Sequence, residues 1–349
     1  MNNNDKRKVP STVPTTRKKE TNSMIHVLHK TASITALSLA ASGIAYADVW
    51  DLPSPQPADN YITENVSWFA DQVREVTNGE LDIRVHPSGS LFPGDQIKRA
   101  VQRDQAQIGV HVLSAHQNEN ILYGIDSVPF LADSFEESAQ LWEVTKPALD
   151  ELMAEQNLQL LYHIPWPPQG IFFDREIDTP EDAEGLNFRA YNTATARFAE
   201  LMGMTPTLIE EAELSQAAAT GMVQSLISSG DPVYNHQLWD YLPHFYDAKA
   251  WLVLSHVFVN KDRWEALDEE IKEDVLAIAT EAEQRGEEQA RELTDELKSR
   301  LGDKGVAINQ PNEDLQAEFN RIGEAMQEEW LEKAGPQGRQ LVEEYRAMQ

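Results

Sequence analysis

The sequence predicts an α/β protein of two domains that are braced by a long helix. Amphipathic helices and short apolar strands alternate along most of the chain. A stiff turn, Trp166-Pro167-Pro168-Gln169-Gly170, interrupts this alternation and marks a crossover between domains. A stretch rich in Glu and Ala and free of Pro runs from Asp268 to about Arg300. As a helix it would be about 45 Å long, which exceeds one domain and indicates a brace across two.

The composition sets limits on the function. The chain has 349 residues, of which 41% are apolar and 25% charged, enough for one or two packed domains. Its 29 basic and 58 acidic residues give a net charge of −29, which excludes a phosphate-backbone partner. The chain has no Cys, which excludes disulfides, zinc–thiolate sites, iron–sulfur clusters and cysteine nucleophiles. We also expect no cofactor and no metal.

The N-terminus is typical of an export signal. Residues 31–45 form an apolar run that is too short for a bilayer span of about 20 residues. Lys30 precedes the run and Ala45-Tyr46-Ala47 ends it with a small-x-small pattern, so we expect cleavage after Ala47 and a mature chain that begins at Asp48. Residues 1–47 are therefore assigned as a signal peptide. Met24 would open one of ordinary length, so the gene start is over-extended or the basic segment is unusually long. An uncleaved signal anchor is the alternative.

Export leaves a strongly acidic protein. Residues 48–349 hold 22 basic and 56 acidic residues, a net charge of −34, and only eight of the basic residues are Lys. Such a surface suits a protein that stays soluble where salt screens charge over a few ångströms. We therefore expect the folded state to be more stable in high salt.

The periodicity of apolar residues assigns the elements in chain order. In the first half it predicts helices at 61–76, 95–104 and 135–155 and strands at 81–85, 107–113 and 158–164. After the turn it predicts strands at 171–174, 186–191, 205–209 and 222–228 and helices at 193–202 and 212–220. An aromatic-rich segment, 239–259, completes the second sheet. Strands separated by helices predict mostly parallel sheets.

Catalytic signals are weak. The sequence lacks His-Glu-x-x-His, Gly-x-Ser-x-Gly, Walker and dinucleotide glycine motifs. Glu210, Glu211 and Glu213 crowd one turn, which keeps a secreted glycoside hydrolase open as an alternative, although acidic residues at a helix start ordinarily complement the helix dipole. His111 and His163 lie in apolar strands, where a hydrogen-bonded core imidazole is the common arrangement.

Arg189 is the strongest candidate for binding. Strand alternation from Leu186 to Tyr191 places Arg189 on the face opposite Phe188. A guanidinium there pairs with a protein carboxylate, lies at the surface, or binds a ligand carboxylate through two parallel hydrogen bonds. Four aromatic residues lie at turns or strand ends around this sheet and would exclude water from such a site: Trp166, Tyr191, Trp239 and Trp251.

Several segments resemble a known family. Residues 177–189 (IDTPEDAEGLNFR) are similar to the TPEDLKGLKIR block of TRAP-transporter solute-binding proteins, the DctP family, and 203–221 (GMTPTLIEEAELSQAAATG) are similar to the block that follows it. With 77–81 and 87–91, the resemblance covers essentially the whole mature chain in order.

The resemblance implies a two-domain periplasmic binding protein fold with a ligand cleft between the domains. The expected domains are 48–166 with about 255–295, and 167–254 with about 296–349. It also implies a periplasmic receptor, not an enzyme, that delivers an organic acid to a TRAP membrane permease for uptake driven by an ion gradient. A sensory subunit with the same fold is the remaining alternative.

The resemblance further implies the site. Arg189 falls on the family's carboxylate-binding arginine. Gln169 stands where some relatives have a second arginine, and Ser228 stands near an asparagine of others, so uncharged partners predict a monocarboxylate. By position Glu211 and Trp251 also face the cleft, where Glu211 would accept hydrogen bonds from ligand hydroxyls. An aromatic, 2-oxo, 2-hydroxy or sugar acid is expected.

Overall fold

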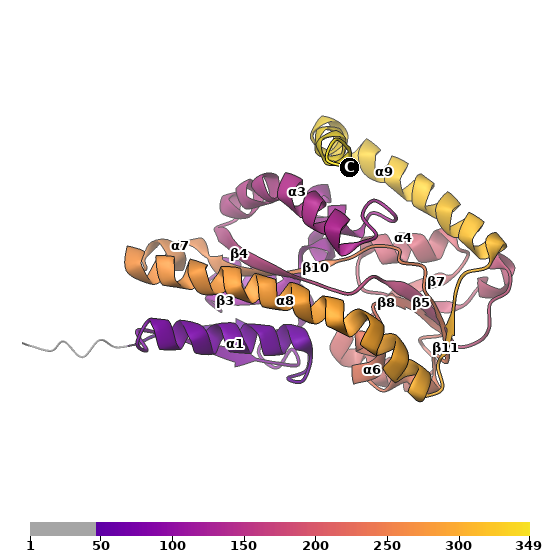
Figure 1. Cartoon of the computed structure of the whole chain (residues 1–349), viewed down its shortest axis with the longest axis horizontal. Coiled ribbons are helices and arrows are strands. Elements are labelled where there is room, and N and C mark those ends of the chain that lie inside the picture. The colour runs from indigo at the N-terminus through magenta and orange to yellow at the C-terminus, as the bar shows by residue number, and fades with distance from the viewer. Residues whose placement is uncertain (1–46) are drawn as a thin grey trace, which may run out of the picture. The chain divides into compact units, whose positions relative to one another are not determined.

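The computed structural model describes residues 47–349, so the predicted signal segment before Ala47 lies outside the described residues. The strands of the described residues form three sheets, with helices packed around them (Figure 1). No helix between residues 47 and 349 is both long and apolar enough to cross a membrane.

The first part of the chain forms two small sheets with helices around them. The parallel pair consists of β1 (Asp48–Pro53) and β2 (Leu81–His86). The second sheet has the order β3 (Ile108–Val112), β10 (Leu254–Asn260), β4 (Leu158–Pro165). The helices of this part are α1 (Tyr61–Val76), α2 (Gly94–Gln102), α3 (Phe135–Glu155), α7 (Lys261–Glu265), and the 3₁₀ turns η1 (Leu113–His116) and η2 (Ile121–Ser127).

A six-stranded sheet forms the second part. Its order is β11 (Ala307–Asn309), β9 (His244–Tyr246), β5 (Gly170–Phe173), β8 (Ser225–Ser228), β6 (Asn187–Ala190), β7 (Thr205–Leu208). Its helices and 3₁₀ turns are η3 (Pro180–Ala183), α4 (Thr193–Leu201), η4 (Glu211–Glu213), α5 (Leu214–Ala219), α6 (Asp231–Asn235) and η5 (Leu238–Asp240). The turn at 166–169 links β4 to β5, and thus connects the three-stranded sheet to the six-stranded sheet.

The expectation of mostly parallel sheets is wrong. β10 pairs antiparallel with both β3 and β4, and β5 pairs antiparallel with both β8 and β9. The helical crossover from β3 to β4 does give these two strands the same direction, but they are not neighbours. β10 arrives from the six-stranded sheet and inserts between them in the opposite direction, which local periodicity does not reveal.

The predicted long helix is α8 (Glu269–Asp303), and it braces the two parts as expected (Figure 1). It contacts α1 and β4 of the first part and α6 and β11 of the second. Gly286 allows the close approach, since a Cβ there would lie 2.9 Å from Ile164 Cγ2 and 3.3 Å from Asn65 Nδ2. The side chain of Asn65 already donates to the α8 backbone at Ala282 O, at 2.8 Å.

The last helix, α9 (Glu313–Arg346), also contacts both parts. It bends at Gly335, whose φ of 62° is non-helical and which precedes Pro336. Before the bend it contacts α4, and it also packs against α3 and η2. After the bend, Tyr345 donates to Leu131 O at 2.9 Å, which anchors the C-terminal end.

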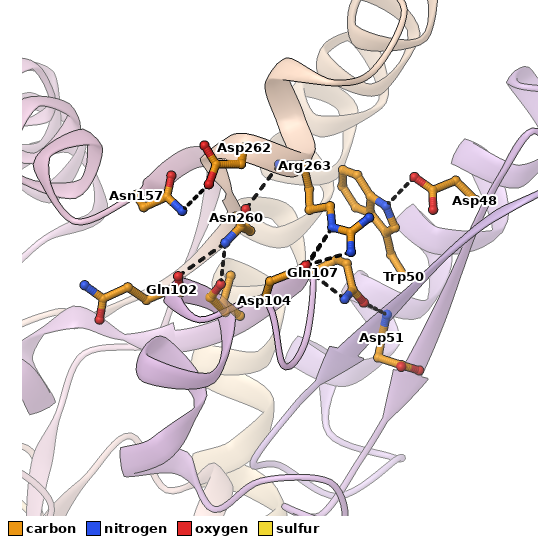
Figure 2. A network of polar contacts seen from close by, with 11 residues as sticks. Asp48, Trp50, Asp51, Gln102, Asp104, Gln107, Asn157, Asn260, Asp262 and Arg263 are labelled. Atoms are coloured by element: carbon orange, nitrogen blue, oxygen red, sulfur yellow. Dashed lines mark hydrogen bonds and ion pairs between the residues drawn. The ribbon is translucent and has the colours of Figure 1, made fainter.

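A polar network fixes β1 to the segment that follows β10 (Figure 2). Arg263 forms a bidentate pair with Asp104, with nitrogen–oxygen distances of 2.7–2.9 Å. Gln107 donates to Asp104 and accepts from the backbone N–H of Asp51, both at 3.1 Å. Asn260 donates to Val101 O at 2.9 Å. The network joins β1, the turn after α2, and α7.

Candidate functional site

A cavity with an empty volume of about 590 Å³, its opening included, lies between the two parts. Strands β3, β6 and β8, the turn at 166–169 and the residues after β7 supply its walls. It contains six of the eight residues predicted for the site: Trp166, Gln169, Arg189, Tyr191, Glu211 and Ser228.

Arg189 is held rigidly but is not neutralised. It lies on β6, which pairs in parallel with both β7 and β8, and its side chain is 5% exposed. Its Nε donates to Ile209 O at 2.9 Å, and its Cζ lies 5.3 Å from the ring centre of Tyr191. Among the described residues, no carboxylate oxygen lies within 4.0 Å of its nitrogens. Burial lowers the pKa of Arg189, and the nearby charge of Glu211 opposes that shift.

Tyr191 connects two other predicted residues. The indole Nε1 of Trp251 donates to Tyr191 Oη at 3.0 Å, and Tyr191 Oη donates to Gln169 Oε1 at 3.1 Å. Trp251 is fully buried behind the cavity and does not line it. Gln169 is fixed in turn by backbone hydrogen bonds with Trp251 and Ala250. No described residue accepts a hydrogen bond from the amide Nε2 of Gln169, so this group is available to a ligand in the cavity.

Trp166 and Ser228 form two further parts of the wall. Trp166 is 4% exposed, donates from Nε1 to Ser255 Oγ at 2.9 Å, and packs edge-on against Tyr61. Ser228 Oγ accepts from Gly230 N at 3.3 Å, so its hydroxyl hydrogen remains available. Trp239 lies elsewhere, on η5, with its ring 5.8 Å from that of Tyr234.

Two acidic residues face Arg189. Glu210 and Glu211 follow β7 and line the cavity, whereas Glu213 of the same turn is exposed. The Oε1 atom of Glu211 is buried without a hydrogen-bond partner, 3.6 Å from the equally unpartnered Nε2 of His236. Burial raises the pKa of Glu210, and the charge of Asp95 adds to the shift.

The cavity also contains residues that the sequence did not single out for binding: Gln56, His111, Glu210, Ser229, Pro232 and Val253. Burial lowers the pKa of His111 to about 3, so its imidazole is neutral, with an unpartnered Nδ1. His111 lies near the end of β3, and Gln56 follows β1. Their position after strand ends was the available signal, because ligand sites of α/β folds lie there.

Two buried polar contacts join the parts beside the cavity. Asn60, the N-cap of α1, donates from its side chain to Asp231, the first residue of α6. Asn192 donates to Ser114 Oγ at 3.0 Å and to Ser127 Oγ at 3.3 Å. Burial, assisted by the charge of Glu211, raises the pKa of Asp231 to about 7.

The groups that line the cavity are suited to binding a small ligand. Within residues 47–349, no three His, Asp or Glu side chains are grouped to hold a metal ion. Arg189 is the single Lys or Arg among the cavity residues, and it is surrounded by amide, hydroxyl, carboxylate and aromatic groups. The arrangement suits a small ligand that carries one carboxylate.

Comparison with known proteins identifies the family. Residues 54–334 match the model of the bacterial extracellular solute-binding proteins, family 7, also called DctP. The chain belongs to this family. Its members are substrate-binding receptors and not enzymes, which does not support the hydrolase alternative. The resemblance noted in the sequence, the two-domain fold class and the assignment as a TRAP-transporter solute receptor are thereby confirmed.

Individual relatives are similar over most of their length. The ectoine-binding periplasmic protein TeaA of Halomonas elongata is 24% identical over 91% of this chain and 94% of its own. DctP6, an extracytoplasmic solute receptor of Bordetella pertussis that binds pyroglutamic acid, is 39% identical, with a TM-score of 0.84 over 86% of this chain and 100% of its own. A marine metagenome TRAP solute-binding protein specific for pyroglutamate is 40% identical, with a TM-score of 0.85 over 86% and 99%.

Proposed function

We propose that this receptor binds a small organic monocarboxylate, of which pyroglutamate is the leading candidate, through Arg189. The observation that carries the proposal is a buried guanidinium that faces a cavity and has no carboxylate partner among the described residues. Burying an unpaired charge costs several kcal/mol, so a ligand carboxylate would relieve a real penalty. Two relatives at 39% and 40% identity bind pyroglutamate, which supports the ligand class.

The remaining contacts fit one carboxylate rather than two. Gln169 stands where a second arginine would serve a dicarboxylate, and its free Nε2 can donate to the carboxylate that Arg189 binds. Ser228, at the end of the neighbouring strand β8, can also donate. Trp166 and Tyr191 provide flat apolar faces for a compact ring. We assign these residues to ligand contact, and Trp251 to positioning Tyr191.

We propose that the protein acts in the periplasm after cleavage behind Ala47. Support comes from β1, which begins at Asp48, where the backbone N–H donates to Glu80 O at 2.7 Å. The first described strand thus begins at the first residue after the predicted cleavage site. The receptor then delivers its ligand to the TRAP permease, with 48–166 and about 255–295 as one domain and 167–254 and about 296–349 as the other.

A thermal-unfolding screen tests the ligand class. Pyroglutamate at 100 times its dissociation constant would add about 2.7 kcal/mol of stability and raise the midpoint visibly. The panel includes aromatic, 2-oxo, 2-hydroxy and sugar monocarboxylates and dicarboxylates, with pyroglutamate methyl ester as a neutral control of nearly the same shape. We expect monocarboxylates alone to raise the midpoint. A shift by the ester as large as that by the acid would contradict the proposal.

A further inference from the structure

Two opposite charges share the cavity without meeting. Arg189 has no carboxylate within 4.0 Å among the described residues, and Glu211 has no Lys or Arg nitrogen within that distance. The Oε1 atom of Glu211 is buried and unpartnered. Among the described basic side chains, only His236 lies within 4.0 Å of it, with its Nε2 at 3.6 Å, which is too long for a hydrogen bond.

The fold keeps the two side chains apart. Arg189 extends from β6, and its Nε is tied to Ile209 O, two residues before Glu211. Glu211 starts η4, which continues into α5. His236 is occupied on its other side, where Ser215 Oγ lies 3.4 Å from Nδ1 and donates to His236 O at 3.3 Å. A direct ion pair is therefore not formed, and a gap remains between anion and cation.

A ligand that binds between Arg189 and Glu211 must form favourable contacts with both side chains. A carboxylate on Arg189 also lies near Glu210 and Glu211, whose charges repel it. A hydrogen-bond donor on the ligand, separate from its carboxylate, would offset that repulsion and give Glu211 the partner it lacks. A ring acid that presents only acceptor oxygens to Glu211 would leave a buried acceptor facing another acceptor.

We propose that Glu211 is a specificity-determining residue that accepts a hydrogen bond from an N–H group of the ligand, so the receptor selects carboxylates with a ring N–H, such as lactam acids, over oxygen isosteres of the same shape. The inference rests on the proposed function, because it takes Arg189 as the carboxylate end. It narrows the ligand class beyond monocarboxylates in general. A purely structural role, in which Glu211 only neighbours His236, predicts no such selection.

An isosteric ligand pair tests this. Pyroglutamate and (S)-5-oxotetrahydrofuran-2-carboxylate differ by ring N–H against ring oxygen. Dissociation constants for both are measured by calorimetry on the exported protein, on Glu211→Gln and on Glu213→Gln, which removes an exposed charge from the same turn. We expect the unaltered protein to bind the lactam about 10- to 150-fold more tightly, the effect of leaving a charged hydrogen-bonding group unpaired.

The two variants show whether Glu211 is responsible for the preference for the lactam. Glutamine can offer oxygen to the lactam or its amide to the lactone, so Glu211→Gln should bring the ratio within about threefold, while Glu213→Gln should leave it unchanged. Equal binding of both ligands by the unaltered protein overturns the inference, and this comparison needs no variant to fold. A ratio that survives in Glu211→Gln also overturns it. Failure of both ligands to bind would instead refute the proposed function.

Discussion

The side chain of Tyr191 positions other groups of the site through its hydroxyl. It accepts from Trp251 and donates to Gln169, so Tyr191→Phe leaves a buried indole N–H without a partner. We expect the free energy of unfolding to fall by about 1–3 kcal/mol. Urea denaturation measures this, and Tyr241→Phe, at a 43% exposed position, should change it by less than about 0.5 kcal/mol. An equal effect of the two substitutions would refute the positioning role.

Asp231 makes stability depend on pH. Its pKa is raised to about 7 in the folded protein, against about 3.9 in the unfolded chain, so folding favours the protonated form. The resulting stabilisation is fully present below the unfolded pKa and is lost as pH rises through about 7. Asp126, whose pKa burial also raises to about 7, acts in the same direction.

Replacing Asp231 isolates its share of that dependence. Between pH 5 and 8 the unaltered protein should lose about 2–3 kcal/mol more stability than Asp231→Asn does, since the asparagine cannot titrate. Urea denaturation at each pH gives both values. Parallel curves for the two proteins would show that the Asp231 carboxyl ionises normally.

Strand alternation was sufficient to place Arg189 on the face opposite the buried Phe188, whereas its assignment to a ligand came from the family resemblance. His111 and Glu210 were interpreted as a core imidazole and a helix-start residue. The hydrogen-bonded imidazole expected for His111 is not found, because its buried Nδ1 has no partner among the described residues. Both residues line the cavity because β3 and the β7–η4 turn meet there. That meeting depends on tertiary contacts, which a single sequence does not encode in any local pattern.

At the scale of elements, α8 is the clearest case of close packing, and two of its glycines provide a matched test. A Cβ at Gly286 would lie 2.9 Å from Ile164, whereas one at Gly302 meets nothing within 4 Å. Gly286→Ala should therefore destabilise the protein by about 1–3 kcal/mol, despite the better helix propensity of alanine. Gly302→Ala should be neutral or stabilise by up to about 1 kcal/mol. Urea midpoints compare them, and a stabilising Gly286→Ala would contradict the packing described.

The predicted helices were located more accurately than the predicted sheets. The helix at 61–76 and the helix at 135–155 coincide with α1 and α3, since caps and apolar spacing are local signals. By contrast, β10 was hidden in an aromatic-rich segment, and its place between β3 and β4 is set by residues about 90 and 150 positions away. Short strands such as β9 and β11 have three residues each, too few for a recognisable period.

At the scale of the whole molecule, charge should govern stability in salt. With a net charge of −34 on residues 48–349, mutual repulsion opposes the folded state where screening is weak. The screening length falls from about 30 Å at 0.01 M salt to about 3 Å at 1 M. We expect the urea midpoint to rise over this range of NaCl, with sucrose as the uncharged control. A maximum below about 0.1 M would contradict this interpretation of the acidic surface.

The central claim is that one buried arginine binds the carboxylate of the ligand, and calorimetric titration of pyroglutamate tests it most directly. Removing Arg189 leaves the bound carboxylate unpaired at a cost of about 3–5 kcal/mol, so Arg189→Ala should weaken binding about 200- to 5000-fold. The control is Arg84→Ala, an arginine with a 60% exposed side chain that pairs with Asp82 away from the cavity, and it should bind as the unaltered protein does. A loss of less than fivefold in a folded Arg189→Ala protein would contradict the account.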